Sequence, residues 1–298
     1  MASGVRTFDA EVLGTTRLSA HLVTVTLGGE LDGYATTGIP DEYVRLMIPP
    51  AGASLQLPVI DENWKITYPD DAPELAYRVY TVSDHRIVEG QTQLDLDIAL
   101  HDEGIGSDWA RDCKPGDRVG IIEPHGLYAA PAGVGWQLLV ADITGVPAVA
   151  RILRGLDPGQ RVEVVIVLTD PADEIALPSA ADVSITWQIV AKDTDIADAL
   201  AEAVTSRELP AEDRYVWLAG EARASRAVRR HLRRELGWPQ ADFYTCGYWQ
   251  VDAEKWNARY DEVADEVIAK AAEVQKKVGE DEGAYLDALD DIYESVGL

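Results

Sequence analysis

Two short segments carry the side chains whose chemistry is most informative. The first, Arg78-Val79-Tyr80-Thr81-Val82, places a cation, an aromatic ring and a hydroxyl on an extended stretch. The second, His101-Asp102-Glu103-Gly104-Ile105-Gly106-Ser107-Asp108-Trp109, places two glycines and a serine in a turn. An aromatic face stacks on a flat ring, arginine binds pyrophosphate with two nitrogens, and glycine lets the backbone approach a phosphate. Together they predict a flavin dinucleotide site, although either alone also fits an ordinary strand or a capped turn.

The alternation of a β-strand decides how the first segment presents its side chains. Successive residues point to opposite faces, so Arg78 and Tyr80 share one face and Thr81 points the other way. In the second segment, Ser107 precedes Asp108-Trp109-Ala110-Arg111 and is expected to cap a short helix. Because the amino end of a helix attracts anions, this turn is a candidate phosphate site.

Length and composition limit the possible classes of protein. The 298 residues predict about two domains, and a hydrophobic content of 47% is enough to build their cores. A net charge of −26 repels phosphate and anionic lipid, so we expect neither nucleic acid nor an anionic membrane surface as a partner. The simplest interpretation of this charge is a highly soluble surface.

Cysteine positions and hydropathy predict a cytoplasmic protein without a signal peptide or a membrane-spanning segment. Cys113 and Cys246 are far apart and form no CxxC motif, so we expect no disulfide framework or thiolate zinc site, and a reducing cytoplasm fits. Residues 1–6 are not followed by an apolar run, which predicts no signal peptide. No stretch of about 18 apolar residues occurs, so no membrane insertion is expected.

Up to about residue 130 the hydrophobic pattern has a period of two, which is typical of half-buried antiparallel strands. Turn signals such as Lys114-Pro115-Gly116-Asp117 separate the segments. Six or so short strands in this pattern predict a small closed antiparallel barrel. The clearest expected strands are 21–27, 43–48, 77–82, 94–100 and 118–122.

After residue 131 the pattern changes to alternating strands and helices. Residues 136–141 are continuously apolar, as in a strand that is buried on both faces. The alternation predicts a parallel sheet with helices on both faces. The expected elements are strand 136–141, helix 146–156, strands 162–168 and 185–190, helix 193–204, strand 215–219, helix 222–236 and strand 243–246.

From about residue 252 the chain becomes helical and acidic. Apolar residues at helical spacing run from Trp256 to Val274, and a second helix is indicated around Leu289. Residues 252–298 hold 14 acidic and 5 basic side chains, so their net charge is −9. We interpret this extension as an amphipathic cap packed on the core, with a lid or a dimer contact as alternatives. The predicted domains are residues 1–130, 131–250 and 251–298.

Two strand-to-helix junctions of the second domain are further candidate sites. Residues 142–147 follow one strand, and residues 217–222 contain the end of another. Ligands of open α/β sheets bind at such carboxyl ends, although no GxGxxG motif is present. The helix after Gly220 carries six arginines, for which a solvated face is slightly favoured over attraction for a phosphate or an acidic chelate. The five histidines show no metal-ligand spacing, and no nucleophile–base set is visible.

The order of these landmarks resembles the siderophore-interacting proteins, the FAD-dependent ferric-siderophore reductases among the ferredoxin-reductase-like flavoproteins. Arg78, Tyr80, Thr81 and Val82 match the family's R-x-Y-T-V pattern, and residues 101–110 resemble its phosphate segment. The resemblance covers about residues 5–250. Its later landmarks are Pro115-Gly116-Asp117, Pro124-His125-Gly126, residues 147–153, residues 217–221 and Gly247-Tyr248-Trp249.

The resemblance implies an FAD-binding barrel followed by a domain that binds NADH or NADPH. No protein-bound metal is expected, because the histidines lack metal-ligand spacing. The resemblance also implies that Arg45, where the family commonly has lysine, attracts an anionic ferric siderophore. The residues implied for FAD are Arg78, Val79, Tyr80, Thr81, His101, Gly104, Gly106, Ser107 and Trp109. Those implied near the nicotinamide are Thr144, Gly220, Glu221, Tyr248 and Trp249.

The sequence departs from the family pattern at several positions. Ser83 and Gln250 stand where arginine is usual, and Glu123 replaces a usual glycine. Ile143 and Gly145 differ from the common D-E-T-A-L-P. With two cations fewer in the expected cleft, the sequence leaves the charge and identity of the siderophore open.

The implied function is a flavin-dependent reductase that passes electrons from NADH or NADPH through FAD to Fe(III) in a siderophore, releasing Fe(II). An acidic loop at residues 169–174 slightly favours NADH, because a carboxylate suits a ribose hydroxyl better than a 2′-phosphate. Three alternatives remain open. They are a general NAD(P)H–flavin or ferredoxin-type oxidoreductase on the same fold, a non-catalytic siderophore-binding module and a flavin-dependent sensor.

Overall fold

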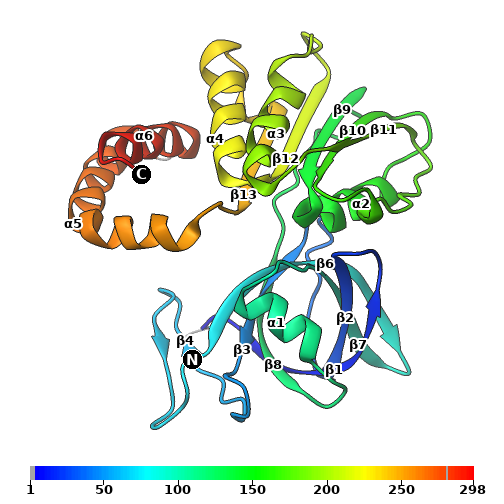
Figure 1. The fold of residues 1–298 in the computed structure, drawn as a ribbon, viewed down its shortest axis with the longest axis vertical. Helices are drawn as coiled ribbons and strands as arrows, with labels where there is room; N and C mark the ends of the chain where they lie inside the picture. Colours follow the sequence, from blue (N-terminus) through cyan, green and yellow to red (C-terminus); the bar gives the residue numbers. More distant parts are fainter. Residues whose placement is uncertain (1–3, 280) are drawn as a thin grey trace.

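The computed structural model describes residues 4–279 and 281–298. Residues 1–3, on which the expectation of no signal peptide partly rests, lie outside the described residues, as does Glu280 of the acidic extension. Figure 1 shows a barrel at the bottom, a sheet with flanking helices above it and a helical extension at the left. The predicted fold class, an antiparallel barrel, a parallel sheet and carboxyl-terminal helices, is therefore confirmed.

The barrel is closed in the order β1-β2-β7-β6-β3-β8, and its pairs are antiparallel. Alternation along β7 places Leu94, Leu96 and Ile98 inside with no exposed surface, and burying each such side chain contributes roughly 1.5–3 kcal/mol. The strands are β1 (Thr7–Arg17), β2 (Leu22–Glu30), β3 (Tyr43–Ile48), β6 (Ala76–Val88), β7 (Gln91–Ala99) and β8 (Arg118–His125).

Three strands of this part were not predicted from the sequence. Strand β1 alternates only in its first half, and its register shifts between Val12 and Gly14, which hides the period of two. The short strands β4 (Val59–Ile60) and β5 (Ile66–Thr67) form a separate hairpin in the long segment between β3 and β6. Helix α1 (Ile105–Asp112), where the sequence predicts a short helix, follows β7 and packs Ala110 into the barrel core.

The second part is a parallel sheet in the order β11-β10-β9-β12-β13. All seven residues of the central strand β9 are buried, as its continuous apolar run predicted. Helix α2 packs on one face, and helices α3 and α4 pack on the other (Figure 1). The elements are β9 (Trp136–Asp142), η1 (Ile143–Gly145), α2 (Val146–Arg154), β10 (Arg161–Leu168), η2 (Pro171–Asp173), β11 (Asp182–Ile189), η3 (Asp193–Asp195), α3 (Ile196–Thr205), β12 (Arg214–Glu221), α4 (Ala222–Arg230), η4 (His231–Glu235), η5 (Gln240–Asp242) and β13 (Phe243–Trp249).

The extension consists of α5 (Ala253–Val278) and α6 (Glu282–Ser295), which leave the end of β13 and return toward α4 (Figure 1). The two expected helices are confirmed. The expectation that their apolar faces pack on the core as a cap is wrong. The buried apolar residues Val267, Ile292 and Val296 form a cluster of the extension's own, between α5 and α6.

Ion pairs join the extension to the sheet domain, which also corrects the expectation of a solvated arginine face. The arginine cluster consists of Arg229 and Arg230 at the end of α4 and Arg233 and Arg234 in η4, which is a π-helix rather than a continuation of α4. These side chains pair with acidic residues around α6, namely Asp281, Asp287, Asp290, Asp291 and Glu294.

Candidate functional site

Strand β6 presents the predicted site residues on two different faces. In its register with β3, Arg78 lies opposite Leu46 and Tyr80 opposite Val44, whereas Thr81 lies opposite Tyr43. Arg78 and Tyr80 therefore share one face, as the alternation predicts. Val79, opposite Arg45, shares the other face with Thr81. A ligand that uses all of these residues has to bend around the strand.

The first face of β6 lies against the amino end of α1. A Cβ atom on Gly106 would collide with the Tyr80 hydroxyl and approach Cγ of Arg78, so only glycine permits this contact. Burial raises the pKa of Tyr80 to about 12, although the Arg78 charge opposes the shift. The Tyr80 phenol is therefore a neutral ring and hydroxyl beside an arginine at physiological pH.

The amino end of α1 has the properties of an anion site. Gly104 is its N-cap residue with φ of +126°, and no side chain caps this helix end in the described part of the chain. The predicted capping role of Ser107 is wrong, because Ser107 lies inside the first turn, buried, and its Oγ accepts the N–H of His101 at 2.9 Å. The first amides of α1, beside Arg78, are thus available to a phosphate.

A groove of about 510 Å³ continues this face along α1. Ala76, two residues before Arg78 on the same face of β6, lines it together with Ile105 and Trp109 of α1. The remaining lining residues are Ile48, Pro49, Pro50, Ala51, Glu74, Asp108, Asp112, Cys113 and Asp117. Apolar walls with carboxylates at the rim suit a flat, hydrogen-bonding group such as a nucleoside.

The second face of the barrel carries a cluster of cationic and aromatic groups. The Arg45 guanidinium lies 4.8 Å from the ring centroid of Trp64, at the tip of the β4–β5 hairpin, and 5.8 Å from that of Tyr43. The His125 ring is 5.8 Å from Tyr43 and 6.1 Å from Trp64. Among the described residues, neither Arg45 Nη1 nor His125 Nε2 has a hydrogen-bond partner, although both atoms are buried. Buried polar atoms without a protein partner usually bind water or a ligand.

The carboxyl ends of β9, β12 and β13 bring together the residues predicted for the nicotinamide side. Asp142 Oδ1 accepts both the N–H and the hydroxyl of Thr144, and its Oδ2 accepts Trp249 Nε1 at 2.7 Å. Burial raises the pKa of Asp142, against the effect of these hydrogen bonds. A Cβ atom on Gly220 would collide with the same carboxylate. The junction that begins at Asp142 was a candidate site, but its contact with Trp249 was not predicted, because the two residues are 107 positions apart.

Glu221 lies at this edge, but its carboxylate binds backbone N–H groups of the protein. Its Oε2 accepts the N–H groups of Arg223 and Ala224 as the N-cap of α4, and its Oε1 accepts that of Val251. Its side chain is buried. Glu221 therefore shapes the start of α4 and the path of the chain after β13.

Aromatic residues connect this edge to the barrel. The His101 ring lies 5.9 Å from that of Trp249. Burial, with the charge of Asp41 nearby, raises the pKa of Tyr248 well above its usual range, and Tyr248 also lies beside Thr81 and Tyr43. Residues from β3, β6 and β13 thus meet between the two domains, where a flat ring held by β6 would face the carboxyl edge of the sheet.

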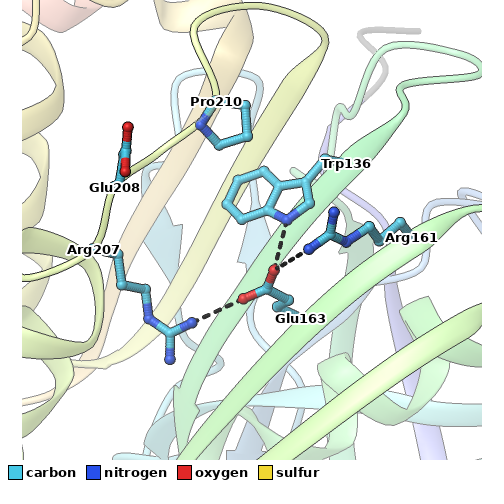
Figure 2. A pocket seen from close by; sticks show the side chains of 6 residues that line it. All are labelled: Trp136, Arg161, Glu163, Arg207, Glu208 and Pro210. Carbon is cyan, nitrogen blue, oxygen red and sulfur yellow. Dashed lines mark hydrogen bonds and ion pairs between the residues drawn. The ribbon is translucent and has the colours of Figure 1, made fainter.

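A second pocket, of about 260 Å³, lies at the opposite end of the sheet (Figure 2). Glu163 accepts Trp136 Nε1 at 3.0 Å and pairs with Arg161 and Arg207. Its carboxylate therefore already has cationic and N–H partners, and the pocket is far from the carboxyl ends of the strands. We assign it a structural role.

No group of three or more His, Cys, Asp or Glu side chains in residues 4–279 and 281–298 has an arrangement that could hold a metal ion. None of the helices in the same residues is both long and apolar enough to cross a membrane.

Comparison with known proteins gives matches to both domains. The model of the siderophore-interacting FAD-binding domain matches residues 11–128, and that of the siderophore-interacting protein matches residues 134–252. Both matches end before α5.

Individual relatives cover the same range. The NADPH-dependent ferric-chelate reductase of Escherichia coli is 29% identical over 247 residues, which is 82% of this chain and 92% of that protein. The ferric vibriobactin reductase of Vibrio cholerae is 29% identical over 241 residues, 78% of this chain and 85% of that protein. The crystal structure of a siderophore utilization protein from T. fusca superposes with a TM-score of 0.70 at 28% identity, over 85% of this chain and 95% of that chain.

Proposed function

Because the chain belongs to the siderophore-interacting protein family, we propose that it passes electrons from NADH or NADPH through FAD to Fe(III) in a ferric siderophore, releasing Fe(II). The observation that carries the proposal is the arrangement around β6. A neutral aromatic ring and an arginine adjoin an uncapped helix end on one face, and a half-buried arginine adjoins aromatic rings on the other.

The residues of β6 and of the amino end of α1 fit FAD. Arg78 and the first amides of α1 would bind the pyrophosphate, Tyr80 would lie against the ring system, and Thr81 would bond its edge. The groove along α1, lined by Trp109, has the size and the polarity for the adenosine half. When bound, FAD supplies the conversion between two-electron oxidation of nicotinamide and one-electron reduction of iron.

The residues of the carboxyl edge orient the nicotinamide nucleotide. Asp142 holds Thr144 and Trp249 in fixed positions, and its carboxylate lies so close to Gly220 that only glycine fits there. In the acidic loop at residues 169–174, which favoured NADH, two carboxylates already have hydrogen-bond partners in the protein. Asp170 accepts the N–H of Ala172, and Asp173 accepts hydrogen bonds from Ser19 and His21. Either nucleotide is therefore a candidate donor.

The second face of the barrel supplies the siderophore site. Arg45 offers one cation whose Nη1 has no partner among the described residues, and His125 offers a second nitrogen on a ring near the same two aromatic residues, Tyr43 and Trp64. An anionic chelate bound there would satisfy both donors. No acid or base on the protein is needed for this step, because electrons rather than protons pass to the iron.

An anaerobic visible spectrum of FAD-supplemented and desalted protein tests the proposal. We expect a retained flavin band that bleaches with NADH or NADPH and returns when a ferric siderophore is added, while an Fe(II) chelator develops colour. Protein that retains no flavin, or flavin that neither nucleotide bleaches, would contradict the reductase. Bleaching that only free flavin or a protein acceptor reverses would contradict the siderophore as substrate.

A further inference from the structure

Helix α2 connects the two halves of the proposed site. It begins at Val146, two residues after Thr144, and its last turn reaches the barrel. There Arg151 Nη1 donates to the carbonyl oxygen of Val82 at 2.7 Å, and Arg154 Nη2 donates to that of Ser83. Both acceptors directly follow Thr81 on β6. One short helix therefore links the nicotinamide edge to the flavin strand.

The acceptor carbonyls lie where β6 leaves its regular ladder. The register of β6 with β7 shifts between Val82 and Asp84, so the strand is bulged at Ser83. Backbone carbonyls at a bulge lose ladder partners and need others when they are buried. The two arginines of α2 supply these partners from the other domain.

Glu42 fixes the same peptide from the barrel side. Its carbonyl oxygen accepts Val82 N–H at 2.8 Å, and its fully buried carboxylate lies 3.8 Å from Arg151 Nη1. Tyr34, Thr36 and Thr37 donate to that carboxylate. The residue after Thr81 is thus held at its N–H by Glu42 and at its carbonyl by Arg151.

We propose that Arg151 and Arg154 are positioning residues, which set the distance between the nicotinamide edge and the flavin strand through α2. This inference rests on the proposed function for the identity of the two ligands. Neither arginine touches the reacting atoms; each fixes β6 relative to α2. Loss of either one allows the domains to separate or rotate while Arg78, Tyr80 and α1 still hold FAD.

The first test measures geometry without any cofactor. Spin labels at Thr16 of β1 and Asp182 of β11, in a chain with Cys113 and Cys246 replaced by alanine, report the distance between the domains. We expect a broader distance distribution in Arg151→Met and Arg154→Met than in the parent. Arg161→Met, at the amino end of β10, is the matched control and keeps the parent distribution. Unchanged distributions in both test variants would overturn the inference.

The second test separates the two half-reactions by anaerobic stopped-flow spectroscopy. In the variants we expect flavin reduction at saturating nucleotide to slow by about tenfold or more, because small displacements of reacting groups are costly. Flavin retention, and the reoxidation of dithionite-reduced protein by a ferric siderophore, should match the parent. Equal slowing of both half-reactions would indicate general damage and refute a positioning role.

Two outcomes, a variant that does not fold and a parent protein that neither nucleotide reduces, have their own measurements. If Arg151→Met does not fold, Arg154→Met and Arg151→Lys replace it, because Arg154 donates to the backbone carbonyl of Ser83 and lysine preserves the charge beside Glu42. If the parent protein is not reduced by either nucleotide, the proposed function fails, and the distance measurement still decides the inference.

Discussion

At the scale of single residues, the site depends on close contacts that only particular side chains allow. Gly106 leaves room for the Tyr80 hydroxyl, and Asp142 joins Thr144 to Trp249. Arg45 lies between two aromatic rings with one nitrogen unpaired among the described atoms. Each contact has a consequence that a single substitution can measure.

Gly106→Ala should weaken FAD binding. The added methyl group would overlap the Tyr80 hydroxyl, so α1 has to move away from β6 and from Arg78. We expect the dissociation constant for FAD, measured by flavin fluorescence, to rise by about tenfold, in line with about 1–3 kcal/mol for overpacking. Gly14→Ala is the control, because a Cβ there meets nothing within 4 Å. Equal affinity in both variants would refute the assigned role of this contact.

Arg45→Met should raise KM for an anionic ferric siderophore and leave flavin reduction by the nucleotide unchanged. Methionine keeps the apolar contact with Trp64 but removes the charge. The parent KM should increase with ionic strength, and the variant should lose most of this dependence, because salt screens the attraction of charges. A variant with the parent's KM and salt dependence would exclude Arg45 from substrate binding.

At the scale of elements, the arginine cluster explains how an acidic extension docks on an acidic protein. Arg229 and its partners Asp287 and Asp290 are nearly buried, whereas Arg230–Glu294 is exposed. Removing one partner of a buried pair is costly, whereas exposed pairs contribute little. Docking of α6 therefore depends mainly on the contacts of Arg229.

Asp290→Ala should loosen the extension. Arg229 then lies buried with one acidic partner fewer, at a cost of about 3 kcal/mol to docking. We expect limited proteolysis between α5 and α6 to become faster, and faster still in high salt. Asp265→Ala, an exposed position on α5, should cleave like the parent. Equal cleavage rates would show that the apolar cluster alone holds the extension.

At the scale of the whole molecule, Glu42 links the barrel, β6 and α2, and its titration should couple pH to stability. Burial raises the pKa of Glu42, but hydrogen bonds from Thr36 and Thr37 and the Arg151 charge outweigh burial, so the net pKa is lowered. A carboxyl with a lowered folded-state pKa stabilises the fold above its unfolded pKa and loses that contribution as pH falls through the folded pKa.

The free energy of unfolding should therefore differ most between the parent and Glu42→Gln near neutral pH. The difference should shrink as the pH falls from about 6 to about 3, because the parent carboxylate then becomes protonated. Urea titrations at several pH values measure it. A difference that stays constant over this range would show that Glu42 acts through packing and not through its charge.

Local pattern was sufficient to predict most of the elements. The period of two predicted the barrel strands except β1, whose bulge at Leu13 breaks the alternation, and the continuous apolar run predicted β9. The hairpin β4–β5 was not predicted, because a strand of two residues is too short to show an alternating hydrophobic pattern. The end of α4 was misassigned because a π-turn and an α-turn have the same local composition.

The site was predictable only in part, for the same physical reason. The sequence by itself determined which residues have the chemistry for a flavin, a phosphate and an anionic chelate, since residue type and strand period are local properties. Only the tertiary structure decided that Ser107 accepts from His101, that the arginine cluster faces α6, and that Arg151 reaches Val82. The two last contacts join residues more than 50 positions apart, and no periodicity encodes such a pairing; packing of whole domains brings these side chains together.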